Sequence, residues 1–169
     1  MRLNRIVAGA AMMLSITSCS ASMKLGEAVV TMAGETPCFS VPQDPSTEGG
    51  IPLFEISVTA HTLRASRADR LQWKMEISPP GASIQTFPDK CFAYGALPPG
   101  GVEVVKKPLK SFTVYAVAIE ARPEKSNMLA YLALFCMKPD ATGKMEIFTM
   151  SRSQNHGEGR FDICQKPAT

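Results

Sequence analysis

Two histidines and two strand-embedded glutamates are the side chains best suited to acid–base chemistry in this chain of 169 residues. His61 ends an alternating apolar segment, and His156 lies in a glycine-rich run (HGEG). Glu55 and Glu120 interrupt apolar segments, where burial would raise the pKa of a carboxyl group. No GxSxG elbow or distinctive pair of acids accompanies them. We interpret the histidines as rim or turn residues and the glutamates as outward-facing, and we predict no enzymatic activity; a hydrolase using His61 is the minor alternative.

The first cysteine suggests a different chemistry, the attachment of lipid. A basic start with Arg2 and Arg5 precedes an apolar run over residues 6–16, and small residues follow before Cys19. This order is typical of a secretory signal peptide, and the run is shorter than the ~20 residues that a membrane-spanning helix needs. The residues ITSC resemble the lipobox of bacterial lipoproteins. That resemblance implies cleavage before Cys19, acylation of its thiol and, with Ser20 next, delivery to the outer membrane.

The lipobox divides the chain into three parts. We predict a signal peptide over residues 1–18, a lipidated tether over 19–25 and one domain over 26–169. A plain signal peptide cut near residue 22 is the alternative. Removal of the signal leaves sixteen basic residues against fifteen acidic ones, so the net charge of +3 for the whole chain falls to about +1. This small charge argues against nucleic-acid binding.

Four cysteines remain for the folded domain, namely Cys38, Cys91, Cys136 and Cys164. An even number in an oxidising compartment indicates a disulfide framework, and four cysteines allow three connectivities. We favour Cys38–Cys91 and Cys136–Cys164, since each bond then joins neighbouring parts of the chain. Without a CxxC pair or clustered histidines, we expect no metal site and no cofactor.

Two basic clusters are candidates for contact with a partner. Arg64, Arg67 and Arg70 recur at a spacing of three residues, and Lys106, Lys107 and Lys110 surround a proline. Either cluster could bind an acidic protein or lipid headgroups, or could simply be a solvated loop. Arginine is enriched at binding hot spots, so the arginine cluster is the preferred partner-binding candidate.

Short apolar segments separated by turns predict the elements that position these residues. Leucine, tryptophan, methionine and isoleucine alternate with polar residues over 71–77, which predicts a half-buried strand with Trp73 in the core. Phe54, Ile56, Val58 and Ala60 share one face of a strand over 51–60. The remaining expected strands cover residues 27–32, 37–41, 111–121, 128–137, 145–149 and 160–165, and residues 63–71 could form one or two helical turns.

About eight short strands in a chain that is 45% hydrophobic and 20% charged predict an all-β fold. We expect an antiparallel β-sandwich, for which an immunoglobulin-like arrangement is one candidate, with a closed barrel as the alternative.

The arrangement of cysteines and turns resembles one family. The lipobox is followed by GEAVV at residues 26–30, PCFSVP at 37–42, PDKCFAYG at 88–95 and YLALFC at 131–136. This order is similar to that of the periplasmic type VI secretion immunity lipoproteins of Gram-negative bacteria. The resemblance implies a protein that binds and neutralises a toxin effector in the periplasm, anchored to the outer membrane by its lipid. A structural or assembly lipoprotein of the envelope or of a secretion apparatus is the alternative.

Overall fold

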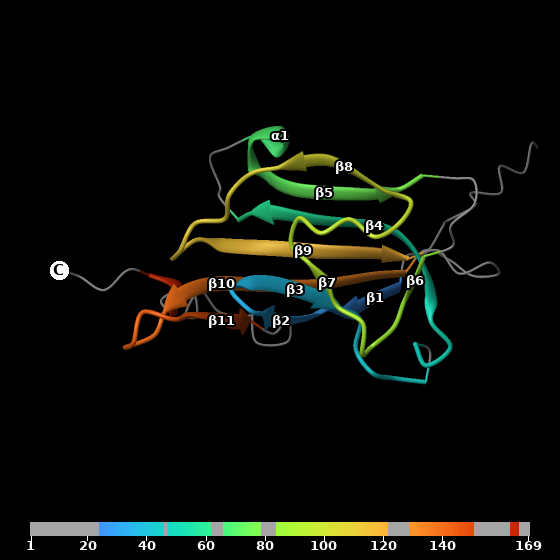
Figure 1. The fold of residues 1–169 in the computed structure, drawn as a ribbon, viewed down its shortest axis with the longest axis horizontal. Helices are drawn as coiled ribbons and strands as arrows, with labels where there is room; N and C mark the ends of the chain where they lie inside the picture. Colours follow the sequence, from blue (N-terminus) through green and yellow to red (C-terminus); the bar gives the residue numbers. More distant parts are fainter. Residues whose placement is uncertain are drawn as a thin grey trace, which may run out of the picture.

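The protein is an all-β sandwich, as the sequence predicts (Figure 1). The computed structural model describes residues 24–45, 47–61, 66–78, 84–121, 129–150 and 163–165. Within them a large sheet has the order β1-β10-β9-β4-β5-β8, with β11 also paired to β10 and β6 to β4, and a small sheet has the order β2-β3-β7. An immunoglobulin-like arrangement remains a prediction.

The elements have the following bounds. The strands of the large sheet are β1 (Lys24–Glu27), β4 (Ile51–Ala60), β5 (Leu71–Ile77), β6 (Gln85–Thr86), β8 (Gly101–Lys106), β9 (Val114–Ala121), β10 (Leu129–Pro139) and β11 (Met145–Met150). The small sheet consists of β2 (Val29–Ala33), β3 (Thr36–Ser40) and β7 (Phe92–Ala93). One helical turn, α1 (Arg67–Arg70), precedes β5.

Aromatic side chains fill the space between the two sheets. Trp73 is fully buried, as predicted, and its ring centroid lies 6.2 Å from that of Phe39 and 5.3 Å from that of Tyr94. Phe135 packs against Phe39 from the large sheet and against Tyr115 on the neighbouring strand, each at 5.6 Å. We call the side of the large sheet that carries Trp73 and Phe135 its inner face, and the opposite side its outer face.

The chain crosses from one sheet to the other at Ala28, which corrects the prediction of one strand over 27–32. Ala28 is buried and its amide donates to the carbonyl of Leu132, so the chain is held at the corner where β1 ends and β2 begins. Gly26 lies against the ring of Tyr131, so close that a Cβ atom would clash with it. Because β1 begins at Lys24, the folded domain also extends two residues into the predicted tether over 19–25.

The pattern in β4 differs from the expected alternation because the strand contains a bulge. Its register shifts between Leu53 and Glu55. A bulge adds one residue and turns the following side chains to the other face. Leu53 therefore enters the core together with Ile56 and Val58, whereas Phe54, expected on that face, is only half-buried.

Both favoured disulfides are present. Cys38–Cys91 connects β3 to the segment before β7, and Cys136–Cys164 connects β10 to the last described residues of the chain. The strand expected over 160–165 is wrong for its described part, because residues 163–164 form a 3-10 turn. Eleven strands occur in the described residues rather than about eight, since β6, β7 and β8 were missed.

Candidate partner-binding surface

The fold brings Arg70, the last residue of the arginine cluster, and the lysine cluster to one end of the sandwich. Strands β4 and β8 finish at this end, and β5 and β9 begin there, on the left in Figure 1. The register pairs Trp73 with Lys106, and the amide of Lys107 donates to the carbonyl of Gln72 at 2.7 Å. Residues more than thirty positions apart in the sequence thus become neighbours. We call Arg70, Lys106, Lys107 and Lys110 the basic end.

Backbone contacts hold the basic end in place. The Tyr94 hydroxyl lies 2.6 Å from the carbonyl oxygen of Lys107 and 3.0 Å from that of Gln72, and it donates its proton between them. Burial raises the pKa of this phenol above its ordinary value, so the group stays protonated as the donor. The amide of Lys110 donates to the Tyr115 hydroxyl at 2.6 Å. The segment that carries the lysines is therefore anchored to the core by two tyrosines.

The charges of the basic end are not neutralised by described carboxylates. The Nζ atoms of Lys106 and Lys107 donate to the carbonyls of Gly95 and Asp69, each at 3.4 Å. None of the four residues of the basic end forms an ion pair with a described residue. The Asp69 carboxylate instead accepts a 2.6 Å hydrogen bond from Ser66, which caps α1. This end therefore presents an excess of positive charge to solvent.

Arg70 also lies beside a groove on the outer face of the large sheet. The groove has a volume of about 530 Å³, and its lining includes Ser57, Thr59, Ala116, Ala118 and Leu134. Small side chains on β4 and β9 form the floor of the groove, and larger side chains on both sides form its walls. The Nε atom of Arg70 is shielded from solvent and has no hydrogen-bond partner among the described residues. We call this feature the outer groove.

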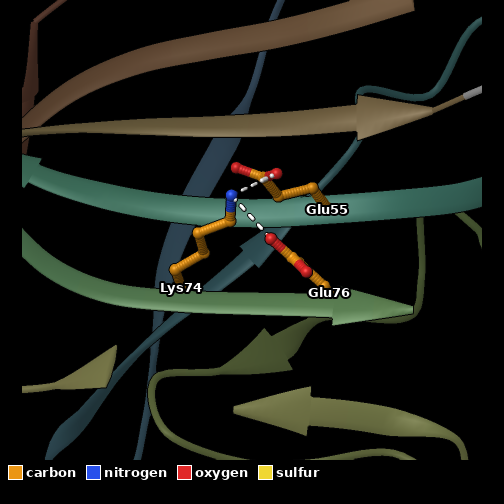
Figure 2. A network of polar contacts seen from close by, with 3 residues as sticks. All are labelled: Glu55, Lys74 and Glu76. Carbon is orange, nitrogen blue, oxygen red and sulfur yellow. Dashed lines mark ion pairs between the residues drawn. The ribbon is translucent and has the colours of Figure 1, made fainter. Parts of the chain in front are cut away.

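The opposite end of the outer groove is acidic. Glu55 is the register partner of Glu76 on β5 and of Glu120 on β9, so three carboxylates form a row across adjacent strands. Lys74 lies between two of them, with Nζ 2.9 Å from Glu55 and 2.7 Å from Glu76 (Figure 2). Hydrogen bonds to Glu76 and Glu55 raise the pKa of Lys74. One ammonium shared by two carboxylates leaves a net negative charge on the group formed by Lys74, Glu55 and Glu76.

The structure describes some of the residues singled out from the sequence and not others. Arg70 has a described side chain, whereas Arg67 is placed only by its backbone in α1. Cys19, Arg64 and His156 lie outside the described residues.

The fold makes Glu55 and Glu120 neighbours on adjacent strands, but it leaves His61 at the far end of β4. His61 is exposed at the end of β4, and its backbone amide donates to Val114. Glu55 and Glu120 face the outer groove, as expected for outward-facing residues, at the opposite end of β4. No trio of metal-ligating side chains gathers within the part of the chain that the structure describes. In that part, no helix is long and apolar enough to cross the bilayer.

The outer groove is not predicted from the sequence. The sequence predicts only a strand over residues 111–121. In fact Tyr115, Val117 and Ile119 enter the core, and the intervening Ala116 and Ala118 line the groove. The alternation of large with small apolar residues was the available signal.

Comparison with known proteins gives no match to a family model, a curated protein or a solved structure. The resemblance to the immunity lipoproteins therefore remains a prediction.

Proposed function

We propose that this protein is a lipid-anchored periplasmic immunity protein that binds a type VI secretion effector and blocks it. The observation that carries the proposal is the junction of the basic end with the outer groove through Arg70. An arginine beside a groove with apolar walls is the kind of surface that supplies binding hot spots. The two disulfides fit an oxidising compartment such as the periplasm.

The position of the predicted anchor favours a protein partner over lipid headgroups for the basic end. Cys19 precedes the start of β1 by five residues, which span at most about 18 Å when fully extended. Lys24 pairs with Leu129 beside the acidic end of the sheet. The basic end lies at the other end of β4, whose ten residues extend about 33 Å. An anchor at Cys19 thus directs the basic end away from the membrane and towards incoming proteins.

A competition experiment tests the proposal. A strain that lacks the gene is grown with its parent, and we expect the parent to kill it unless the gene is restored. The restored protein should also retain an effector during purification from the periplasm. If the deletion strain survives and no effector is retained, the immunity function is wrong. If the deletion instead stops the strain's own secretion, the assembly alternative is correct.

Restoration with variants locates the binding face. Ala118→Phe fills the outer groove from the middle of β9 and should abolish protection while the protein accumulates normally. Ala33→Phe is the matched control, because Ala33 is an exposed strand alanine in the small sheet. Equal protection by both variants would place the binding face elsewhere. Cys19→Ser tests the anchor separately, since it should release the protein into the soluble fraction without altering its affinity for the effector.

A further inference from the structure

The outer groove has opposite charges at its two ends. Arg70 lies at one end, because its neighbour Leu71 is the register partner of Thr59. The row of Glu55, Glu76 and Glu120 lies at the other end. Thr59 follows Glu55 by four residues on one strand, a distance of about 13 Å at 3.3 Å per residue. A ligand that uses both ends must therefore place its own charges about four extended residues apart.

The floor between these ends suits an extended chain. Ser57, Ala116 and Ala118 lie on adjacent central strands and project no bulky group. Leu132 and Leu134 on β10 form an apolar wall along one side, and Lys74 and Arg70 stand on the β5 side. The floor can therefore accept small or aliphatic side chains, with charged groups only at the ends.

Each charged end of the outer groove can form a further ion pair with a ligand. At one end Arg70 lines the groove and forms no ion pair with a described carboxylate. At the other end Glu55 and Glu76 share the single ammonium of Lys74. A carboxylate from a ligand would complete the first end, and a basic side chain would complete the second.

We infer that the outer groove binds an extended protein segment that has an acidic and a basic side chain four residues apart, with small or aliphatic residues between them. The acidic side chain contacts Arg70, and the basic one lies beside Glu55 and Glu76. This inference rests on the proposed function, since it specifies the segment of the effector that the immunity protein would recognise. Charge at both ends fixes the position and direction of the segment, and the apolar floor supplies contact area.

Short capped peptides test the inference with the purified domain. The probe has the sequence Glu-Ala-Val-Ala-Lys, and two controls carry glutamate at both ends or lysine at both ends. Binding is followed through the backbone amide NMR signals of β4 and β9. We expect the probe to shift the signals of Ser57, Ala116 and Ala118, and to bind about threefold to tenfold more tightly than either control.

A charge reversal sharpens the test. Arg70→Glu should reverse the ranking so that the peptide with two lysines binds most tightly, because both ends of the groove are then acidic. Arg70→Gln should remove the preference for an acidic side chain at that end. This variant replaces Arg70→Glu in the test if Arg70→Glu does not fold. Lys144→Glu, on the exposed turn between β10 and β11, makes the same charge change away from the groove and should leave the ranking unchanged.

The outcomes separate the two proposals. Binding of every peptide weaker than about 10 mM, shifts confined to other strands, or an unchanged ranking in Arg70→Glu would each overturn the inference. If an effector is retained and protection occurs while Arg70→Glu binds it normally, the inference fails and the proposed function stands. If the peptides follow the predicted ranking and the deletion strain is not killed, the groove chemistry stands and the immunity function fails.

Discussion

The two faces of the large sheet are built from the same strands yet have opposite properties. On the inner face, Trp73, Tyr115 and Phe135 are at most 1% exposed and interlock with Phe39 of the small sheet. On the outer face, Ser57, Ala116 and Ala118 occupy the corresponding central positions and remain accessible. Successive side chains of a strand point to opposite sides, so one strand supplies both stability and a surface for binding. Substitutions at adjacent positions of one strand should therefore have separable effects on stability and on binding.

Adjacent residues of β10 provide the largest expected contrast. Phe135→Ala should lower the free energy of unfolding by about 3–5 kcal/mol, because it leaves a cavity among packed aromatic rings. Leu134→Ala, one position earlier on the outer face, should cost about 1 kcal/mol, since the half-buried side chain loses less buried area. Denaturation in urea measures both values. Similar losses would show that the outer face is packed as tightly as the core.

The two disulfides give the next contrast, because Cys38–Cys91 lies at the small sheet and Cys136–Cys164 lies at the large sheet. Replacing Cys136 and Cys164 with alanine should cost about 3.5 kcal/mol in the loop-entropy approximation, for a separation of 28 residues. The same change at Cys38 and Cys91, with a separation of 53, should cost about 4 kcal/mol.

The functional effects of these pairs should differ more than the stability effects. Cys136 and Cys164 form a small buried cluster with Met150, packed with Leu134. Both Leu134 and Met150 line the outer groove. Only the loss of Cys136–Cys164 should therefore weaken effector binding at a temperature where both variants remain folded. Equal binding by both variants, measured by calorimetry, would separate this cluster from the groove.

At alkaline pH, the titration of Tyr94 on the inner side of the sheet should change the free energy of unfolding more than that of Lys74 on the outer face. Burial raises the pKa of Tyr94 in the folded state. The folded protein therefore holds this proton more tightly than the unfolded chain, and stability falls as the pH rises above about 10, the ordinary phenol value. Tyr94→Phe should reduce that slope, and at neutral pH it should cost about 1–2 kcal/mol because two carbonyls lose their donor. Unfolding measured from pH 8 to 11 tests both points; an unaltered slope would contradict the assignment.

Lys74 gives the smallest expected effect. Hydrogen bonds to Glu76 and Glu55 raise the pKa of Lys74 in the folded state above its ordinary value of 10.5. Its contribution to stability is therefore complete below pH 10.5 and is lost as the pH rises through the pKa of the folded state. The Lys74 side chain is partly exposed, so solvent screens these ion pairs, and Lys74→Met should cost at most about 1 kcal/mol at neutral pH. Salt should weaken this contribution and leave that of Tyr94 unchanged. Thermal unfolding at low and high salt distinguishes the two, and a salt-independent loss would mean that Lys74 acts by packing.

Strand bounds and core positions that depend on local sequence patterns were predicted correctly. Strict alternation set the bounds of β5 and placed Trp73 in the core, and the bounds of β4 were also correct. The split at Ala28 and the bulge after Leu53 were not predicted, because they depend on pairing with distant strands. Strand β8 is not predicted, because the alternation of Val102, Glu103 and Val104 is short and ends at Val105. A bulge between Lys74 and Met75 interrupts the pairing of this strand with β5.

The candidate site shows the same division. The sequence identified the arginines at 64, 67 and 70 and the lysines at 106, 107 and 110 as separate basic clusters. It also favoured the two disulfide pairs that the structure contains. Only the tertiary structure decided that Arg70 and the lysines meet, because the antiparallel pairing of β5 with β8 brings the start of one strand to the end of the other. The outer groove likewise depends on register, which places small side chains from β4 and β9 side by side. Residue type determines which chemistry is available, and strand pairing determines which of those residues share a surface.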